Sequence, residues 1–107
     1  MELIKNRLSI KLEEINKEID KLGGYCVTSA NYLCDLRDEF ENLFDDLIFI
    51  NPQNGNILAF RYEGVRQECE CAIKSVDNYS LIKGYYDRGK RHLQQIIKLL
   101  INQLNNA

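Results

Sequence analysis

Apolar residues recur along this chain in alternating steps of three and four, within four segments separated by polar or glycine-containing stretches. The stripe positions are Leu8, Leu12, Ile15, Ile19 and Leu22 in the first segment, Leu33, Leu36, Phe40, Leu43, Leu47 and Ile50 in the second, Leu58, Tyr62, Val65, Cys69, Ala72, Val76 and Tyr79 in the third, and Ile82, Tyr86, Gly89, Leu93, Ile96 and Leu100 in the fourth. This spacing places apolar side chains on one side of an α-helix, whereas a strand would require a period of two. The pattern therefore predicts four amphipathic helices.

The expected helices lie near residues 2–22, 27–50, 57–78 and 81–105. Each is about 33 Å long if it has 22 residues, and equal helices with short connections pack best as an antiparallel up-down four-helix bundle. We therefore expect an all-α fold with a single domain over residues 1–107. An alternative joins the third and fourth segments into one long helix, because the break at residues 77–80 is weaker than the stop at Asn51-Pro52.

The ends of the first two helices carry recognisable signals. Gly23 suits the C-terminal cap of the first helix, where a left-handed residue is common. Thr28 or Ser29 suits the N-terminal cap of the second, because a hydroxyl can accept a hydrogen bond from a free backbone N–H. Cys26 continues the apolar spacing of the second segment and is expected to face the core.

Two closely spaced cysteines, Cys69 and Cys71, flank Glu70 and raise the question of a metal site. On a helix, residues two apart are about 200° apart around the axis, so the two thiols cannot bind one ion. The pattern predicts that Cys69 faces the core and Cys71 faces away from it. Together with Cys26 and Cys34, the spacing differs from the paired knuckles of a zinc site, so we expect neither a metal nor another cofactor.

Charge is distributed unevenly, although the chain as a whole has a net charge of only −2. The second segment carries six carboxylates against Arg37 alone, whereas the fourth carries a net charge of +4. The candidate acidic partner-binding residues are Asp35, Asp38, Glu39, Asp45 and Asp46. An acidic helix can bind a basic groove, including one built for nucleic acid, and the alternative is an ordinary solvated face.

A second candidate site is the basic and aromatic cluster at the start of the fourth segment. Its candidate anion-binding residues are Tyr85, Arg88, Lys90, Arg91 and His92. Guanidinium, ammonium and imidazolium groups would suit a phosphate, an RNA backbone, a nucleotide or an acidic protein surface. The alternative is a solvated helix start with Tyr86 in the core. Gly84 and Gly89 are unfavourable inside a helix, so we expect close packing or a local irregularity there.

Several large apolar residues lie away from the predicted stripes. Ile48, Phe49 and Phe60 lie near the Asn51-Pro52 break and form a candidate apolar partner-binding patch. Leu81, Tyr85 and Leu99 lie off the stripe of the fourth segment. These residues indicate a surface that binds a partner or a second copy of the chain. The alternative is that they widen the buried apolar face, as is ordinary for the helices of a bundle.

The N-terminal residues 1–18 are charged throughout, and no apolar run approaches the roughly 20 residues that span a bilayer. We therefore expect a cytoplasmic protein without a membrane span. Its size and acidity are similar to those of phage- or plasmid-encoded inhibitors of host defence and of bacteriocin immunity proteins. The predicted function is a small non-enzymatic inhibitor or regulator that occupies a protein partner, with possible homodimerisation. The alternative is a phosphate, RNA or nucleotide binder, although direct nucleic-acid binding is the weaker option. Catalysis is not expected, because His92 is the single histidine and no nucleophile is marked for it.

Overall fold

A computed structural model describes residues 2–49, 63–76 and 83–106. It contains helices α1 (Glu2–Lys21), α2 (Val27–Phe49), α3 (Glu63–Ser75) and α4 (Lys83–Asn106), and no strand in these ranges. The prediction of an all-α fold with four helices is confirmed. The expected extensions of α3 to residues 57 and 78 fall largely outside the described residues. Across the described ranges, no helix combines the length and apolar character that a bilayer crossing requires.

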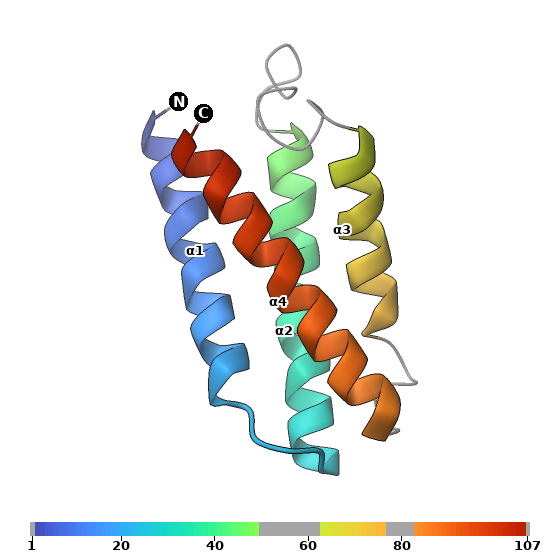
Figure 1. Cartoon of the computed structure of the whole chain (residues 1–107). Helices are drawn as coiled ribbons and strands as arrows, with labels where there is room; N and C mark the ends of the chain where they lie inside the picture. Colours follow the sequence, from blue (N-terminus) through green and yellow to red (C-terminus); the bar gives the residue numbers. More distant parts are fainter. Residues whose placement is uncertain (1, 50–62, 77–82, 107) are drawn as a thin grey trace.

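The helices pack side by side, and consecutive helices alternate in direction (Figure 1). Helix α4 lies against both α1 and α3, whereas α2 lies mainly against α1. The alternative of one continuous helix from the third and fourth segments is wrong. α3 ends at Ser75, the chain bends at Val76, and α4 packs along α3 instead of extending it.

The predicted stripes form the core of the bundle wherever their side chains are described. The buried apolar residues are Leu8, Leu12, Ile15, Ile19, Ala30, Leu33, Leu36, Phe40, Leu43, Phe44, Cys69, Ala72, Ile73, Val76, Tyr86, Leu93, Ile96, Ile97, Leu100 and Leu104. Leu22 is only partly buried, because it follows the last residue of α1. Cys26 was expected in the core and is exposed, because it precedes the first turn of α2.

The C-terminal end of α1 is closed by side chains of α4. The Lys90 ammonium donates a hydrogen bond to the Leu22 carbonyl at 2.9 Å, and the Tyr86 hydroxyl donates one to the Gly23 carbonyl at 3.0 Å. Gly23 does not adopt a positive φ, so the expected left-handed cap is wrong. Carbonyls at a helix end need partners, and here a neighbouring helix supplies them.

The N-terminal end of α2 is capped by Cys26. Its sulfur accepts a hydrogen bond from the Ser29 backbone N–H at 3.4 Å, and its thiol donates one to the Ser29 hydroxyl at 3.2 Å. The expected cap at Thr28 or Ser29 is therefore wrong, because the helix begins at Val27 and its cap lies one residue earlier.

Gly89 sets the distance between α3 and α4. A Cβ atom at this position would lie 2.9 Å from the Ser75 carbonyl oxygen and 3.0 Å from the Val76 Cγ2. The expectation of close packing is confirmed at Gly89, since any side chain there would push the helices apart. At Gly84 nothing lies within 4 Å of such an atom, so close packing does not explain that glycine.

Candidate functional site

An open groove of about 560 Å³ lies between α1 and α2. Its lining residues are Lys11, Glu14, Ile15, Glu18, Tyr32, Leu36, Glu39, Asn42 and Leu43. Ile15, Leu36 and Leu43 are buried and form an apolar floor. Three glutamates and one lysine line it, so the groove is acidic and carries an apolar base, a combination that suits an amphipathic cation.

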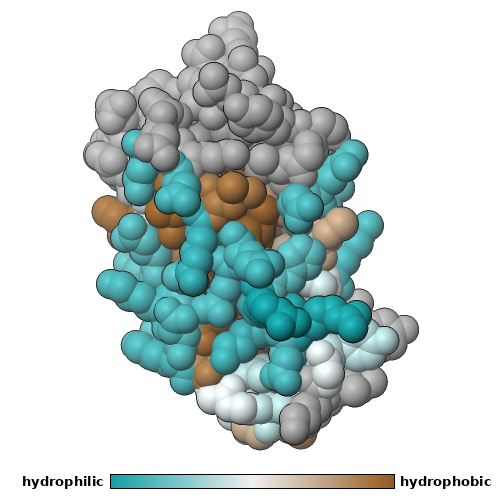
Figure 2. All heavy atoms as spheres, in the orientation of Figure 1, coloured by the Kyte–Doolittle hydropathy of each residue, from teal (hydrophilic) through white to brown (hydrophobic). Residues whose placement is uncertain are grey.

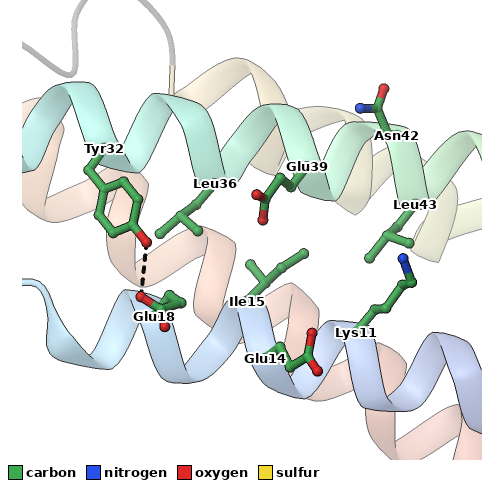
Figure 3. Close-up of a pocket in the computed structure, with 9 residues that line it drawn as sticks. All are labelled: Lys11, Glu14, Ile15, Glu18, Tyr32, Leu36, Glu39, Asn42 and Leu43. Atoms are coloured by element: carbon green, nitrogen blue, oxygen red, sulfur yellow. Dashed lines mark hydrogen bonds between the residues drawn. The ribbon is translucent and has the colours of Figure 1, made fainter.

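Carboxylates come from both helices that border the groove. Figure 3 shows Glu39 on α2 directed toward α1, Glu14 beside the ribbon of α1, and the Lys11 ammonium at the end near Leu43. The amide of Asn42 points away from α1. Carboxylates on facing helices cannot pair with each other, so the groove suits a cationic ligand.

A hydrogen bond closes the opposite end of the groove. The Tyr32 hydroxyl donates to the Glu18 Oε2 atom at 2.9 Å (Figure 3). This bond, followed by the hydrogen bond and charge of Lys21, lowers the pKa of Glu18. The same bond raises the pKa of Tyr32, with smaller contributions from desolvation and then from the charges of Glu18, Glu39 and Asp35. At neutral pH Glu18 is therefore ionised and Tyr32 protonated, which keeps negative charge in the groove.

Among the predicted acidic residues of α2, the side chains of Asp35, Asp38 and Glu39 are described, and they have different surroundings. Glu39 lines the groove, and Asp35 acts electrostatically on Tyr32 at its edge. Asp38 is exposed and accepts a hydrogen bond from the Arg37 Nε atom at 2.7 Å. Arg37 also donates a hydrogen bond to the carbonyl of Val76, which connects α2 to the end of α3.

The remaining predicted partner-binding residues lie where their side chains are not described. Asp45 and Asp46 belong to the last turns of α2, as do Ile48 and Phe49 at its C-terminal end. Their helical backbone is described and their side chains are not, and Phe60 lies outside the described residues altogether. These predictions stay untested.

The basic cluster of α4 is divided among three directions. Lys90 faces α1, where it caps the helix and lies 6.0 Å above the Tyr86 ring. His92 faces α3. The Arg88 guanidinium lies over the Tyr85 ring at 5.6 Å, and both Arg88 and Arg91 are exposed. Because a helix turns 100° per residue, these side chains do not converge on a single anion.

His92 forms a small polar group with α3. Its Nε2 atom lies 3.6 Å from Glu68 Oε2, and its Nδ1 atom lies 3.4 Å from Ser75 Oγ. The arrangement has the residue types of a hydrolytic triad, but the Ser75 hydroxyl already donates to the Ala72 carbonyl at 2.9 Å. Glu68 is largely exposed, so the group joins two helices and does not have the geometry of an activated nucleophile.

Cys69 and Cys71 follow the helical prediction. Cys69 is buried and Cys71 is exposed on the same helix, and none of the four cysteines forms a disulfide. Burial, followed by the charges of Glu68 and Glu70, raises the pKa of Cys69 to about 12. Within the described part of the chain, no group of three His, Cys, Asp or Glu side chains is arranged to hold a metal ion.

Sequence reasoning missed the groove as a unit. Of its polar residues only Glu39 was among the predicted sites, whereas Glu14, Glu18 and Tyr32 were not. One signal was present: Glu14 and Glu18 are one helical turn apart, and Tyr32 and Glu39 are two turns apart. Which helices lie next to each other decides whether these pairs meet, and the periodicity does not specify that.

The chain was compared with protein-family models, with curated proteins and with solved structures, and none of them matches. The function is therefore inferred from the geometry of the groove.

Proposed function

We propose that this protein is a non-enzymatic binding protein that holds a basic, amphipathic helical segment of a partner protein in the α1–α2 groove. The observation that carries the proposal is an apolar floor bordered by carboxylates from both helices. By occupying that segment, the protein would inhibit or regulate its partner. Basic segments of this kind are common in nucleic-acid-binding proteins, which are the partner class that we expect.

The floor and the rims would have different roles in binding. A helix that enters a groove contributes apolar anchors at one or two turns, and these anchors would pack on Ile15, Leu36 and Leu43. Its lysines or arginines would then lie beside Glu14 and Glu39. Because the floor side chains are buried, little apolar surface is left for a ligand to cover, so the carboxylates would supply most of the attraction and would also exclude acidic segments.

The alternative of an anion site on α4 has less support. Lys90 and His92 are engaged with α1 and α3, so only Tyr85, Arg88 and Arg91 of the five candidates remain on the outer surface.

A designed probe tests the proposal. An 18-residue helix of leucine and lysine, with leucines at positions i, i+3, i+4 and i+7, is titrated with the full chain and followed by fluorescence anisotropy. We expect Glu39→Lys to weaken binding by about tenfold or more, since the substitution places a cation where the ligand's cation would lie. A peptide with glutamate in place of lysine should not bind.

Glu41→Lys provides the matched control. Glu41 is also an exposed glutamate of α2, but it does not line the groove, because it lies about 200° around the helix from Glu39. Both variants change the net charge equally, and we expect Glu41→Lys to alter the affinity less than twofold. Equal losses in the two variants would show that overall acidity binds the peptide, and the groove would be rejected as the site.

A further inference from the structure

Helix α4 carries a second stripe beside its buried face. Tyr85, Arg88, His92, Gln95 and Leu99 follow one another in steps of three and four, over about 21 Å. Tyr85 and Leu99 are 44% and 39% exposed, although both are large and apolar. The stripe therefore has an exposed apolar residue at each end and the exposed Arg88 between them, while His92 is half-buried against α3, so the solvent-facing part of the stripe is an amphipathic surface.

Further cations flank this stripe. Arg91 and Lys98 are exposed on the outer side of α4, where Asp87 is the one exposed acidic residue among the described positions of the helix. Figure 2 shows this face of the bundle, with a strongly hydrophilic band in its lower half and an apolar patch above it. The surface has the chemistry that the α1–α2 groove is proposed to accept.

The stripe and the groove lie on opposite edges of the bundle. The side of α4 that faces α1 is marked by Lys90 and Gln94, whose side chains donate hydrogen bonds to Leu22 and to Asn16 and Asp20 respectively. The stripe lies on the other side of α4, where His92 meets α3. One molecule cannot bring its own stripe to its own groove, whereas two molecules can.

The two surfaces also match in length and charge. From Tyr32 to Leu43 the groove extends over about 17 Å of α2, close to the 21 Å of the stripe. Three glutamates and one lysine line the groove. Arg88, Arg91 and Lys98 stand on or beside the stripe. Opposite charge over similar lengths favours one orientation and one register of docking.

We propose that the α4 stripe of one copy docks into the α1–α2 groove of a second copy. This inference rests on the groove being the binding site of the proposed function, and it names a second copy of the chain as one occupant. Because the two surfaces differ and face opposite edges, the contact is heterologous. Copies therefore add head to tail, into open chains or closed rings, and the predicted homodimer would be the shortest member of the series.

Sedimentation velocity of the full chain tests this arrangement at about 10 mM salt, where charges act over about 30 Å. We expect the wild type to sediment faster as its concentration rises, and to slow again at about 1 M salt. The stripe variant Arg88→Glu/Leu99→Gln and the groove variant Glu39→Lys should each lose at least tenfold in association constant. Glu41→Lys should behave as the wild type does.

A mixture of the two defective variants gives the sharpest result. The stripe variant keeps an intact groove and the groove variant keeps an intact stripe. In a 1:1 mixture the two variants can therefore join through one contact, and the heterodimer has no intact surface left for a further copy. We expect a heterodimer that does not grow with concentration. A mixture that stays monomeric, or one that forms longer chains, overturns the proposal, provided that circular dichroism shows both variants to be folded.

The leucine–lysine probe separates this inference from the proposed function. If the wild type remains monomeric while its groove binds the probe, self-association is wrong and the groove stands. If the groove fails to bind the probe yet the variants pair as described, the proposed function fails and only the contact between copies remains. The stripe variant should bind the probe at least as tightly as the wild type, because its groove no longer has a competing occupant.

Discussion

Toward α4, helix α1 is closed by complementary polar contacts, whereas toward α2 it borders an open acidic groove. On the α4 side, Lys90 and Tyr86 donate to the carbonyls at the end of α1, and the amide of Gln94 donates to Asn16 and Asp20. On the α2 side, Glu39 faces the edge of α1 that carries Glu14 and Glu18. One edge of α1 is therefore closed by hydrogen bonds to α4, whereas the other carries excess negative charge, with Glu18 hydrogen-bonded to Tyr32 of α2.

The difference teaches where stability and binding are located. Donors opposite acceptors hold two helices together, so substitutions on the α4 side should lower the free energy of unfolding. Apart from the Tyr32–Glu18 hydrogen bond, the groove sets carboxylates opposite carboxylates, which add nothing to folding, so substitutions of Glu14 or Glu39 should change binding with little loss of stability. Proteins commonly give up some stability to keep a functional surface of this kind.

Thiol reactivity should show the largest contrast between interior and surface. Cys69 is fully buried, so its alkylation requires opening of the core, whereas Cys26 is exposed at the start of α2. We expect iodoacetamide at pH 8 to modify Cys26 more than about 10³ times faster, given ordinary opening free energies of the core. Mass spectrometry of peptides from a time course measures both rates, and comparable rates would contradict the packing of α3.

The pKa values of these two thiols are shifted in opposite directions. Once Cys26 is ionised, the Ser29 hydroxyl and backbone N–H can both donate hydrogen bonds to the thiolate, which lowers the pKa of Cys26, so its alkylation should reach half-maximal rate at a lower pH than that of an ordinary thiol. Ser29→Ala should move that midpoint upward. Burial raises the pKa of Cys69 to about 12. The protonated thiol therefore contributes to the free energy of unfolding at any pH below the ordinary thiol pKa of the unfolded chain, and this contribution is lost as the pH rises toward 12.

The α3–α4 contact should be the most sensitive to a single added methyl group. Gly89→Ala would place its Cβ against the Ser75 carbonyl and Val76, so we expect a loss of about 1–3 kcal/mol in the free energy of unfolding. Gly84→Ala is the control, because it meets nothing within 4 Å and alanine favours helix. Urea titration measures both, and equal effects would reject the close approach.

Removing the hydroxyl that caps α1 should have a smaller effect. Tyr86→Phe keeps the buried ring and its edge-on contact with Tyr25, while the Gly23 carbonyl loses its donor. We expect a loss of about 1 kcal/mol in the same titration. Tyr85→Phe is the matched control, since that tyrosine is exposed and should change stability by less than about 0.5 kcal/mol.

Sequence periodicity predicted the helices and the core well, because burial in a bundle repeats every three to four residues. Leu12, Phe40, Cys69 and Leu93 all lie where the stripes placed them. The ends of the helices were predicted less well. The Gly23 carbonyl is capped by the Tyr86 side chain of a neighbouring helix, and Cys26 caps α2 because that helix begins at Val27. Local helix propensity predicts neither of these contacts.

The candidate sites were harder to predict because each depends on contacts between helices. The sequence predicts that Lys90 and His92 belong to one anion site, but in the structure Lys90 contacts α1 and His92 contacts α3. Glu39 was found through the acidity of its helix, while its partners Glu14 and Glu18 belong to a helix of no net charge. A helix with no net charge can still have an acidic edge, and the packing of the helices is needed to show that this edge borders a groove.

The central claim is that the α1–α2 edge serves binding and not folding. The most direct test measures both properties of Glu39→Lys, with Glu41→Lys as its control. We predict that Glu39→Lys unfolds at an equal or slightly higher urea concentration, since a cation then faces Glu14 and Glu18, while its affinity for the leucine–lysine helix falls about tenfold. A variant that loses stability and keeps its affinity would contradict the account.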